Sequence, residues 1–324
     1  MSPNYWVDDA DSSVISACHR FVLKTGQLRV EASGLLAGGR RGDEHEQVVE
    51  MSKRVQALDH EIATWLITMP PEHRFRTVCW IDDDYTESIT GATHDKTEVF
   101  PGRIDVYPDY VTASMWNIAR VTRMILASIG IRIIAWLSSP VDYRSTAEYS
   151  TLKAICEGTI AEIIASVPYH LGWHIKQKHL LENNPQLSGF VCGEEVPLKA
   201  LPAFLLIWSL VCLKTHDATS DEQRAWAEGR LKFIAESVGI KYSRVLNEVS
   251  LGQLLAVSVL TWVISQLTLR FPSMMIREDG QMEVPDVLMN GKVEVPLSLR
   301  PKIEPQDYES ADLQIGFEDQ NDWG

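Results

Sequence analysis

Tyr169, His170 and His174 form the group of side chains best suited to acid–base chemistry in this sequence. Imidazole titrates near neutral pH, so His170 is a candidate general acid or base, with Tyr169 beside it. The spacing of four residues between His170 and His174 would also suit two metal ligands on one helix face. No carboxylate or cysteine completes such a set nearby, so we predict no metal site. A hydrogen-bonded structural histidine remains the leading alternative for His170.

A second group surrounds Arg120. Trp116 and Asn117 precede it by four and three residues, and Arg123 follows by three, which places all four on one side of a helix. In one interpretation, Arg120 and Asn117 present hydrogen-bond donors to an oxygen-rich ligand.

The other interpretation of Arg120 is structural. A buried arginine must be paired, and Asp105 and Asp109 are acidic residues shortly before it in the chain. An ion pair with either one would fix the helix against the preceding loop.

Aromatic residues extend the predicted site. The chain has ten tryptophans, which belong mostly to the core but also line apolar ligand pockets. The predicted catalytic residues are Arg120, Tyr169 and His170. The predicted substrate-binding residues are Trp116, Asn117, Arg123, Trp173 and Trp208.

The standard catalytic signatures are absent from the sequence. It contains no Gly-x-Ser-x-Gly elbow, no Walker phosphate loop, no dinucleotide-binding glycine motif and no HExxH zinc helix. We therefore predict no cofactor. The five cysteines form no CxxC pair, which indicates a reduced, intracellular protein, and we expect a cytoplasmic location.

The charge of the chain is strongly negative. The 324 residues carry a net charge of −14, which argues against binding to nucleic acid and to anionic membranes. Residues 278–324 contain 12 acidic and three basic residues, a net charge of −9. Most of the acidity therefore belongs to the last seventh of the chain.

The elements that must position these residues are helices. Apolar residues recur at spacings of three and four, and prolines or glycines end the runs. Helices are predicted over residues 8–25, 44–69, 109–137, 145–167, 203–213, 220–239 and 245–271. Residues 72–108 are predicted to be mixed and loop-rich, and Pro168 is predicted to end the fourth helix.

The sequence predicts an all-α fold built on one helical domain. Residues 1–43 form an N-terminal helix and flexible link, residues 44–277 the helical core domain, and residues 278–324 an acidic C-terminal extension of short β or irregular structure. Asn290-Gly291 is a candidate hairpin turn within that extension.

An ordered series of short motifs resembles a known family. The motifs are Ala57-Leu58-Asp59-His60-Glu61, Pro70-Pro71-Glu72-His73-Arg74-Phe75, Val106-Tyr107-Pro108-Asp109-Tyr110, Ala113-Ser114-Met115-Trp116-Asn117-Ile118-Ala119-Arg120, Ile164-Ala165-Ser166-Val167-Pro168-Tyr169-His170-Leu171-Gly172, Phe204-Leu205-Leu206-Ile207-Trp208, and Gly229-Arg230-Leu231-Lys232-Phe233-Ile234-Ala235-Glu236-Ser237-Val238-Gly239-Ile240. The series resembles the C-terminal helical domain of fungal-specific zinc-cluster transcription factors. This resemblance implies that domain's fold and a fungal source.

The sequence departs from that family near its start. Such regulators carry a six-cysteine zinc cluster that reads DNA, whereas the first 55 residues here contain only Cys18. In size and in lacking this module, the chain is also similar to fungal hetero-Diels–Alderases of tropolonic sesquiterpene pathways.

Two hypotheses follow from these resemblances. The first is a pericyclase that joins a tropolone-derived quinone methide to a humulene-type sesquiterpene, a reaction that needs positioning rather than a cofactor. Its partners would be apolar small molecules, with no direct nucleic acid and no membrane. The alternative is a non-enzymatic regulator or dimerisation partner, located in the nucleus and acting in part through the acidic extension. A homo-oligomer is compatible with both hypotheses.

Overall fold

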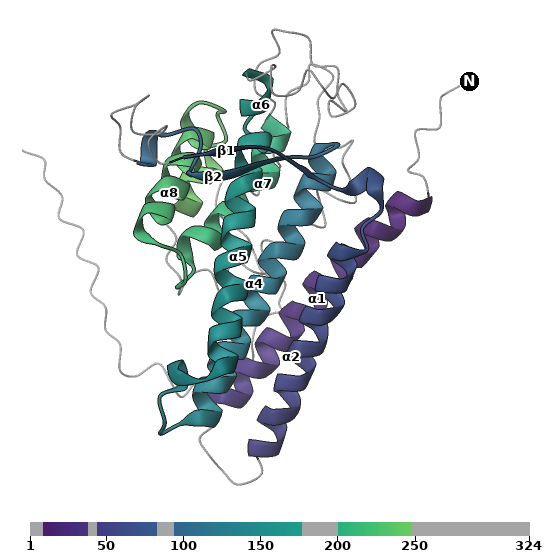
Figure 1. Ribbon diagram of the computed structural model, residues 1–324, viewed down its shortest axis with the longest axis vertical. Coiled ribbons are helices and arrows are strands. Elements are labelled where there is room, and N and C mark those ends of the chain that lie inside the picture. The colour runs from purple at the N-terminus through teal and green to yellow at the C-terminus, as the bar shows by residue number, and fades with distance from the viewer. Residues whose placement is uncertain (1–8, 38–43, 83–93, 177–199, 248–324) are drawn as a thin grey trace, which may run out of the picture. The chain divides into compact units, whose positions relative to one another are not determined.

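The computed structural model describes residues 9–37, 44–82, 94–176 and 200–247 (Figure 1). Contacts between residues divide the chain into two compact units, Met1–Val284 and Pro285–Gly324. The second unit lies wholly outside the described residues, as do the predicted hairpin and acidic extension. The predicted helix over 245–271 also lies almost entirely outside them.

The described part of the first unit is mostly helical, which confirms the all-α prediction. Four long helices dominate it: α1 (Asp9–Ala37), α2 (Glu44–Ile67), α4 (Tyr110–Ser138) and α5 (Ala147–His170). The shorter helices are α6 (Trp173–Lys176), α7 (Ala200–Thr215), α8 (Asp221–Glu236) and α9 (Tyr242–Asn247), with single 3-10 turns η1 (Pro71–His73), η2 (His94–Lys96) and η3 (Tyr143–Ser145).

Helix α4 is the central element of this unit. It packs against α1 and α2 on one side and against α5 and α7 on the other. Two apolar cores form along it, one shared with α1 and α2 and the other with α5, α7 and α8. Among the described helices, α4 is long and apolar enough to cross a membrane by length and composition, but helices on several sides are typical of a core helix.

The segment over residues 72–108, predicted to be mixed and loop-rich, contains two strands that were not predicted. Strands β1 (Arg76–Ile81) and β2 (Gly102–Val106) pair antiparallel, with Arg76 opposite Val106 and Ile81 opposite Gly102. Strand β2 packs on α5, so three of its five residues are buried. Burial against a helix stabilises a two-stranded ribbon that would be marginal alone.

Two helices extend beyond their predicted ends. Helix α1 continues to Ala37 through Gly26 and Gly34 rather than stopping at residue 25, because its apolar side chains pack on α2 and α4. Helix α5 continues through Pro168 to His170. The Leu171 amide then donates to the Val167 carbonyl at 3.0 Å, so the proline falls in the last turn of α5. Tyr169 and His170 consequently belong to a helix rather than to a loop.

The predicted ends of α8 are confirmed. The Ser220 hydroxyl accepts from the Gln223 amide at 3.2 Å, and the Gln223 side chain accepts from the Ser220 amide at 3.1 Å, which is a capping box. After the helix, Gly239 has a φ of 88°, and the Ile240 amide donates to the Ile234 carbonyl at 3.2 Å. This is the left-handed C-terminal motif that favours glycine.

Candidate functional site

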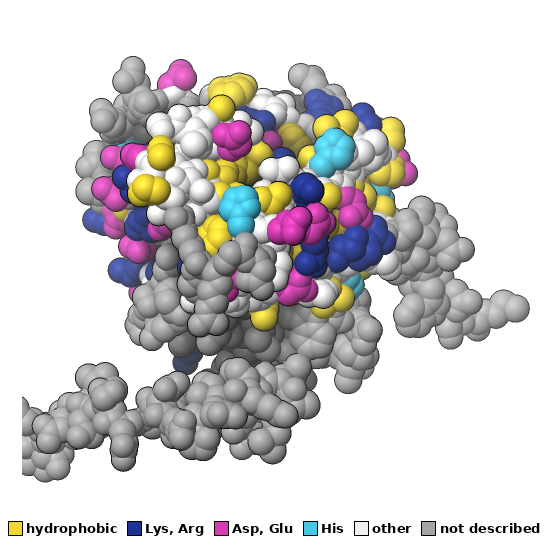
Figure 2. All heavy atoms as spheres, turned by 90° about the horizontal axis from the view of Figure 1, so that it is seen from below, with side chains coloured by type: hydrophobic (Ala, Val, Ile, Leu, Met, Phe, Trp, Pro, Cys, Tyr) yellow, Lys and Arg dark blue, Asp and Glu magenta, His cyan; other side chains and the backbone are white. Residues whose placement is uncertain are grey.

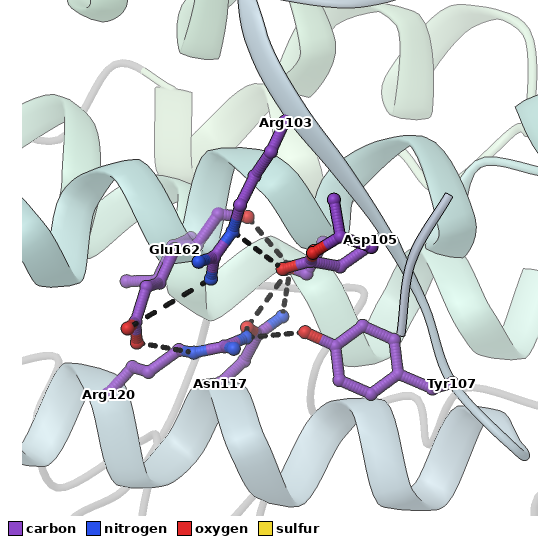
Figure 3. Close-up of polar contacts among 9 residues, drawn as sticks. Arg103, Asp105, Tyr107, Asn117, Arg120 and Glu162 are labelled. Carbon is purple, nitrogen blue, oxygen red and sulfur yellow. Dashed lines mark hydrogen bonds and ion pairs between the residues drawn. The ribbon is translucent and has the colours of Figure 1, made fainter. Parts of the chain in front are cut away.

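The structure brings together five of the eight predicted site residues. Trp116, Asn117 and Arg120 come from α4, and Tyr169 and His170 come from the last turn of α5, which packs against α4. The end of β2 approaches the same place. Figure 3 shows the polar contacts that join these three elements.

Arg120 is the centre of the group. Its Nη1 donates to the Tyr107 hydroxyl at 2.6 Å and to Asn117 Oδ1 at 3.1 Å. Its Nε donates to Glu162 Oε2 on α5 at 3.1 Å. Arg120, Tyr107 and Asn117 are fully buried, whereas Glu162 keeps 40% of its side chain exposed. The guanidinium therefore joins α4 to α5 and to the segment after β2 (Figure 3).

An aromatic shell surrounds the rest of the Arg120 guanidinium. Its carbon lies 5.3 Å from the ring centre of Phe75, 5.8 Å from that of Tyr107 and 5.2 Å from that of Trp116. Within the described part of the chain, Arg120 Nη2 has no hydrogen-bond partner. Attraction between the cation and the ring faces compensates in part for that missing bond.

The charge of Arg120 is stabilised by its neighbours. Burial alone would lower its pKa, but Tyr107, Glu162 and Asp105 together outweigh that effect and hold the pKa above its ordinary value. Burial likewise raises the pKa of the Tyr107 hydroxyl to about 12. Arg120 is thus a permanent cation and Tyr107 a neutral phenol, so neither group exchanges a proton near neutral pH.

The predicted ion pair of Arg120 with Asp105 or Asp109 is not formed among the described residues, although the charge of Asp105 acts on Arg120. Asp105 accepts instead from the Thr77 hydroxyl at 2.7 Å and from Arg103 Nε at 3.1 Å. Asp109 caps α4 by accepting from the amide and hydroxyl of Thr112 at 2.7 and 2.8 Å. The partner on α5, Glu162, comes 42 residues after Arg120 in the chain.

Both ring nitrogens of His170 contact protein groups. His170 is fully buried, with Nδ1 at 3.0 Å from the Pro202 carbonyl and Nε2 at 3.4 Å from Asn117 Nδ2. The carbonyl requires a proton on Nδ1, so Nε2 accepts from the amide. Burial lowers the pKa of His170 to about 4. A neutral imidazole whose two nitrogens both contact protein groups has no free position for acid–base work.

The rings of Tyr169 and His174 contact each other. Their rings stack with centres 4.6 Å apart, and burial lowers the pKa of His174 to about 4. Tyr169 also packs against the rings of Tyr107 and Tyr110, at 5.5 and 5.0 Å. Among the described residues, no group of three His, Cys, Asp or Glu side chains could hold a metal ion.

The other three predicted residues lie elsewhere. Arg123 forms a two-point ion pair with Asp59 of α2, at 2.8 and 3.2 Å. Trp173 packs in a small cluster beside Val99 and Ile104. Trp208 lies against the core that α7 shares with α5 and α8. These residues do not line a common site with Arg120.

Part of this network was not predicted, although the sequence contains one signal for it. Glu162, Ser166 and His170 are spaced by four residues, which places a polar stripe on the mostly buried C-terminal half of α5. Asn117 Nδ2 donates to Ser166 Oγ at 2.8 Å. The whole stripe therefore faces the polar face of α4 formed by Asn117 and Arg120.

The arrangement is suited to holding elements together. Most of its polar groups pair with one another, and the two grooves described along α1 are lined by none of these residues. One network connects β2, α4, α5 and, through the Pro202 carbonyl, α7.

Comparison with known proteins gives one distant similarity to report. The chain is 21% identical over 150 residues to transcription factor dbaG of Emericella nidulans, which covers 46% of this chain and 33% of that protein. The chain thus spans about a third of the length of this relative. No family model and no solved structure matches the chain. The similarity is to a fungal transcription factor, and it gives no support to the resemblance to hetero-Diels–Alderases.

Proposed function

We propose that this chain is a regulatory domain of the fungal transcription factor type, which acts by contacting other proteins and not by catalysis. The observation that carries the proposal is the use of the Arg120 network. Arg120, Asn117 and His170, the polar residues predicted to serve chemistry, instead bind one another and their neighbours in the interior.

The similarity to dbaG supports the regulatory class. It covers nearly half of this chain, and the described residues form the mostly helical domain that the family resemblance implies. These 324 residues contain no six-cysteine cluster. The proposed activity of these residues is therefore protein contact rather than direct reading of DNA, and the proposed place of action is the nucleus.

The acidic extension is the segment proposed to contact the transcription machinery. Residues 278–324 combine a net charge of −9 with interspersed apolar side chains, among them Phe317 and Trp323. Alternation of acidic and apolar residues is typical of activation segments. This part of the proposal rests on the sequence alone.

The cycloaddition hypothesis stays a prediction. It requires a dry pocket in which a quinone methide and a terpene meet beside polar donors. The donors that it assigns, Arg120, Tyr169 and His170, are buried. No observation in the described part of the chain favours this hypothesis over the regulatory one.

The proposed function is tested by a reporter assay. The full chain is fused to a heterologous DNA-binding domain in yeast, and expression from a promoter carrying its sites is compared with the DNA-binding domain alone. We expect a change of several-fold. A fusion that lacks residues 278–324 serves as the matched control and should lose most of the effect.

The enzyme hypothesis is tested on the same chain in vitro. Purified protein is incubated with a tropolone quinone methide precursor and a hydroxyhumulene, and adduct formation is followed by chiral chromatography. We expect the uncatalysed rate and racemic product. Accelerated, single-isomer product together with an inactive reporter fusion would overturn the proposal.

A further inference from the structure

Two grooves run along opposite sides of the C-terminal half of α1. The acidic groove, of about 700 Å³, lies between α1 and α2 and is lined by Glu31, Glu46, Glu50 and Arg54 among others. The basic groove, of about 450 Å³, lies between α1 and α4. Figure 2 views the end of the molecule at which these helices meet and shows hydrophobic side chains exposed between basic and acidic ones.

The acidic groove uses its only arginine internally. Arg54 Nη1 donates to Glu31 Oε2 at 2.6 Å, and Lys53 forms an ion pair with Glu50 at 3.5 Å. The lining of the groove holds three glutamates and one arginine that is already paired, so the acidic groove disfavours anionic ligands.

The basic groove has the opposite character. Its charged lining residues are Arg29 of α1 and Arg132 of α4. Among the described residues, neither forms a hydrogen bond or an ion pair with another side chain or the backbone, in contrast to Arg54, Arg120 and Arg123. Two guanidinium groups thus line one groove without partners in the described part of the chain.

The surroundings of Arg29 disfavour its charged form. Arg29 is half-buried, and burial lowers its pKa below the ordinary arginine value, with the positive charge of Arg132 acting in the same direction. An anion between the two arginines would relieve their repulsion and accept their unused hydrogen bonds.

The rest of the groove is apolar. Leu36, Ile129 and Trp136 line it together with three alanines and Ser33. Ile129 is buried in the core that α1 and α4 share, so the floor of the groove is fixed. A flat aromatic or branched aliphatic body would cover this surface while its acidic group reaches the arginines.

We propose that the groove between α1 and α4 binds a small amphipathic organic anion, whose carboxylate or sulfonate lies between Arg29 and Arg132 and whose apolar body covers Ile129 and Trp136. The site does not depend on the regulatory function, since binding is a property of the chain itself. In a regulator, such a ligand would bridge α1 and α4 and stabilise their packing.

The test uses a pair of fluorescent probes that differ in charge. 1-Anilinonaphthalene-8-sulfonate carries a sulfonate, and N-phenyl-1-naphthylamine has the same aromatic body without it. We expect the full chain to bind the sulfonate with a stoichiometry of one by calorimetry, and more tightly than the neutral probe. Octanoate should displace it.

Variants locate the probe. Arg29→Met and Arg132→Met keep the apolar stems and remove the charge, and each should weaken sulfonate binding by roughly tenfold, from the loss of hydrogen bonds to a charged group. Arg54→Met in the acidic groove is the matched control and should leave the affinity within twofold. Arg132 is exposed, so its single variant is expected to fold.

Three results would overturn the inference. Equal affinity for the charged and neutral probes would show that the arginines do not select an anion. Unchanged sulfonate binding by Arg132→Met, with an unchanged melting temperature, would place the probe elsewhere. Binding of several probe molecules to each chain would indicate nonspecific adsorption to apolar surface.

Discussion

Replacing Arg120 by methionine is predicted to destabilise the fold strongly. Methionine keeps most of the aliphatic volume among Phe75, Tyr107 and Trp116 but removes every polar contact of the guanidinium. The change deletes hydrogen bonds to Tyr107, Asn117 and Glu162. The buried Tyr107 hydroxyl then has no other hydrogen-bond partner among the described residues, whereas Asn117 keeps Ser166.

The magnitude follows from the burial of each group. Breaking a buried ion pair by removing one partner costs about 3–5 kcal/mol. Leaving a buried hydroxyl, here that of Tyr107, without a hydrogen bond costs about 1–3 kcal/mol. Glu162 keeps 40% of its side chain exposed, so water solvates the carboxylate that is left behind. We therefore expect a loss of about 3 kcal/mol in the free energy of unfolding.

Two matched variants calibrate this value. Arg123→Met removes a two-point ion pair whose side chains are 23% and 21% exposed, and should cost about 1–2 kcal/mol because water screens the pair more. Glu162→Gln keeps a hydrogen-bond acceptor at a half-exposed position and should cost less than about 1 kcal/mol.

The assay is urea unfolding of the full chain, followed by tryptophan fluorescence and circular dichroism. The midpoints should fall in the order Glu162→Gln, Arg123→Met, Arg120→Met, with an unchanged dependence on urea. An Arg120→Met protein as stable as Arg123→Met, or more so, would contradict the structural role of Arg120. Arg120 would then be a residue kept for a ligand rather than for the fold.

Two further predictions concern α8 and His170. Gly229→Ala should lower the free energy of unfolding by about 1–3 kcal/mol, measured by heat or urea, since a Cβ there would collide with the Asp95 carbonyl. Gly158→Ala is the control: its Cβ meets open space on an exposed part of α5, and it should raise the free energy of unfolding by about 0.5–1 kcal/mol. Equal effects of the two substitutions would contradict the packing of Gly229 on Asp95. His170 has a pKa of about 4 when folded against 6.5 ordinarily, so the unfolded chain binds the extra proton. The contribution of neutral His170 to the free energy of unfolding is therefore complete above pH 6.5 and declines by about 1 kcal/mol per pH unit as the pH falls toward 4. Urea midpoints measured at pH 7, 6 and 5 should fall with pH, and they should fall less steeply for His170→Asn than for the unchanged chain. The same pH dependence in both proteins would contradict the lowered pKa of His170.

Most helices could be predicted because their signals are local. The apolar spacing of α2, α4 and α7 and the capping box of Ser220 are contained within each segment. The hairpin was missed because β1 and β2 are 20 residues apart and depend on α5 for their burial. Pro168 does not end α5 as predicted, because packing of the last turn of α5 outweighs the loss of one helical hydrogen bond.

The site shows the same division between local and distant information. The common face of Asn117 and Arg120 follows from a spacing of three residues, and the structure joins them by a hydrogen bond. The role of Arg120 depends on Tyr107 and Glu162, which one sequence does not connect with it. A buried cation looks the same in sequence whether its partner is a ligand or a carboxylate of the same chain.

The reporter fusion tests whether this chain regulates through protein contact, as proposed above. At equal levels of intact fusion protein, measured by immunoblot, the full chain should change reporter expression several-fold relative to the DNA-binding domain alone. Removing residues 278–324 should abolish most of that change. Expression equal to that of the DNA-binding domain alone, from a fusion that is folded and nuclear, would contradict the proposed function.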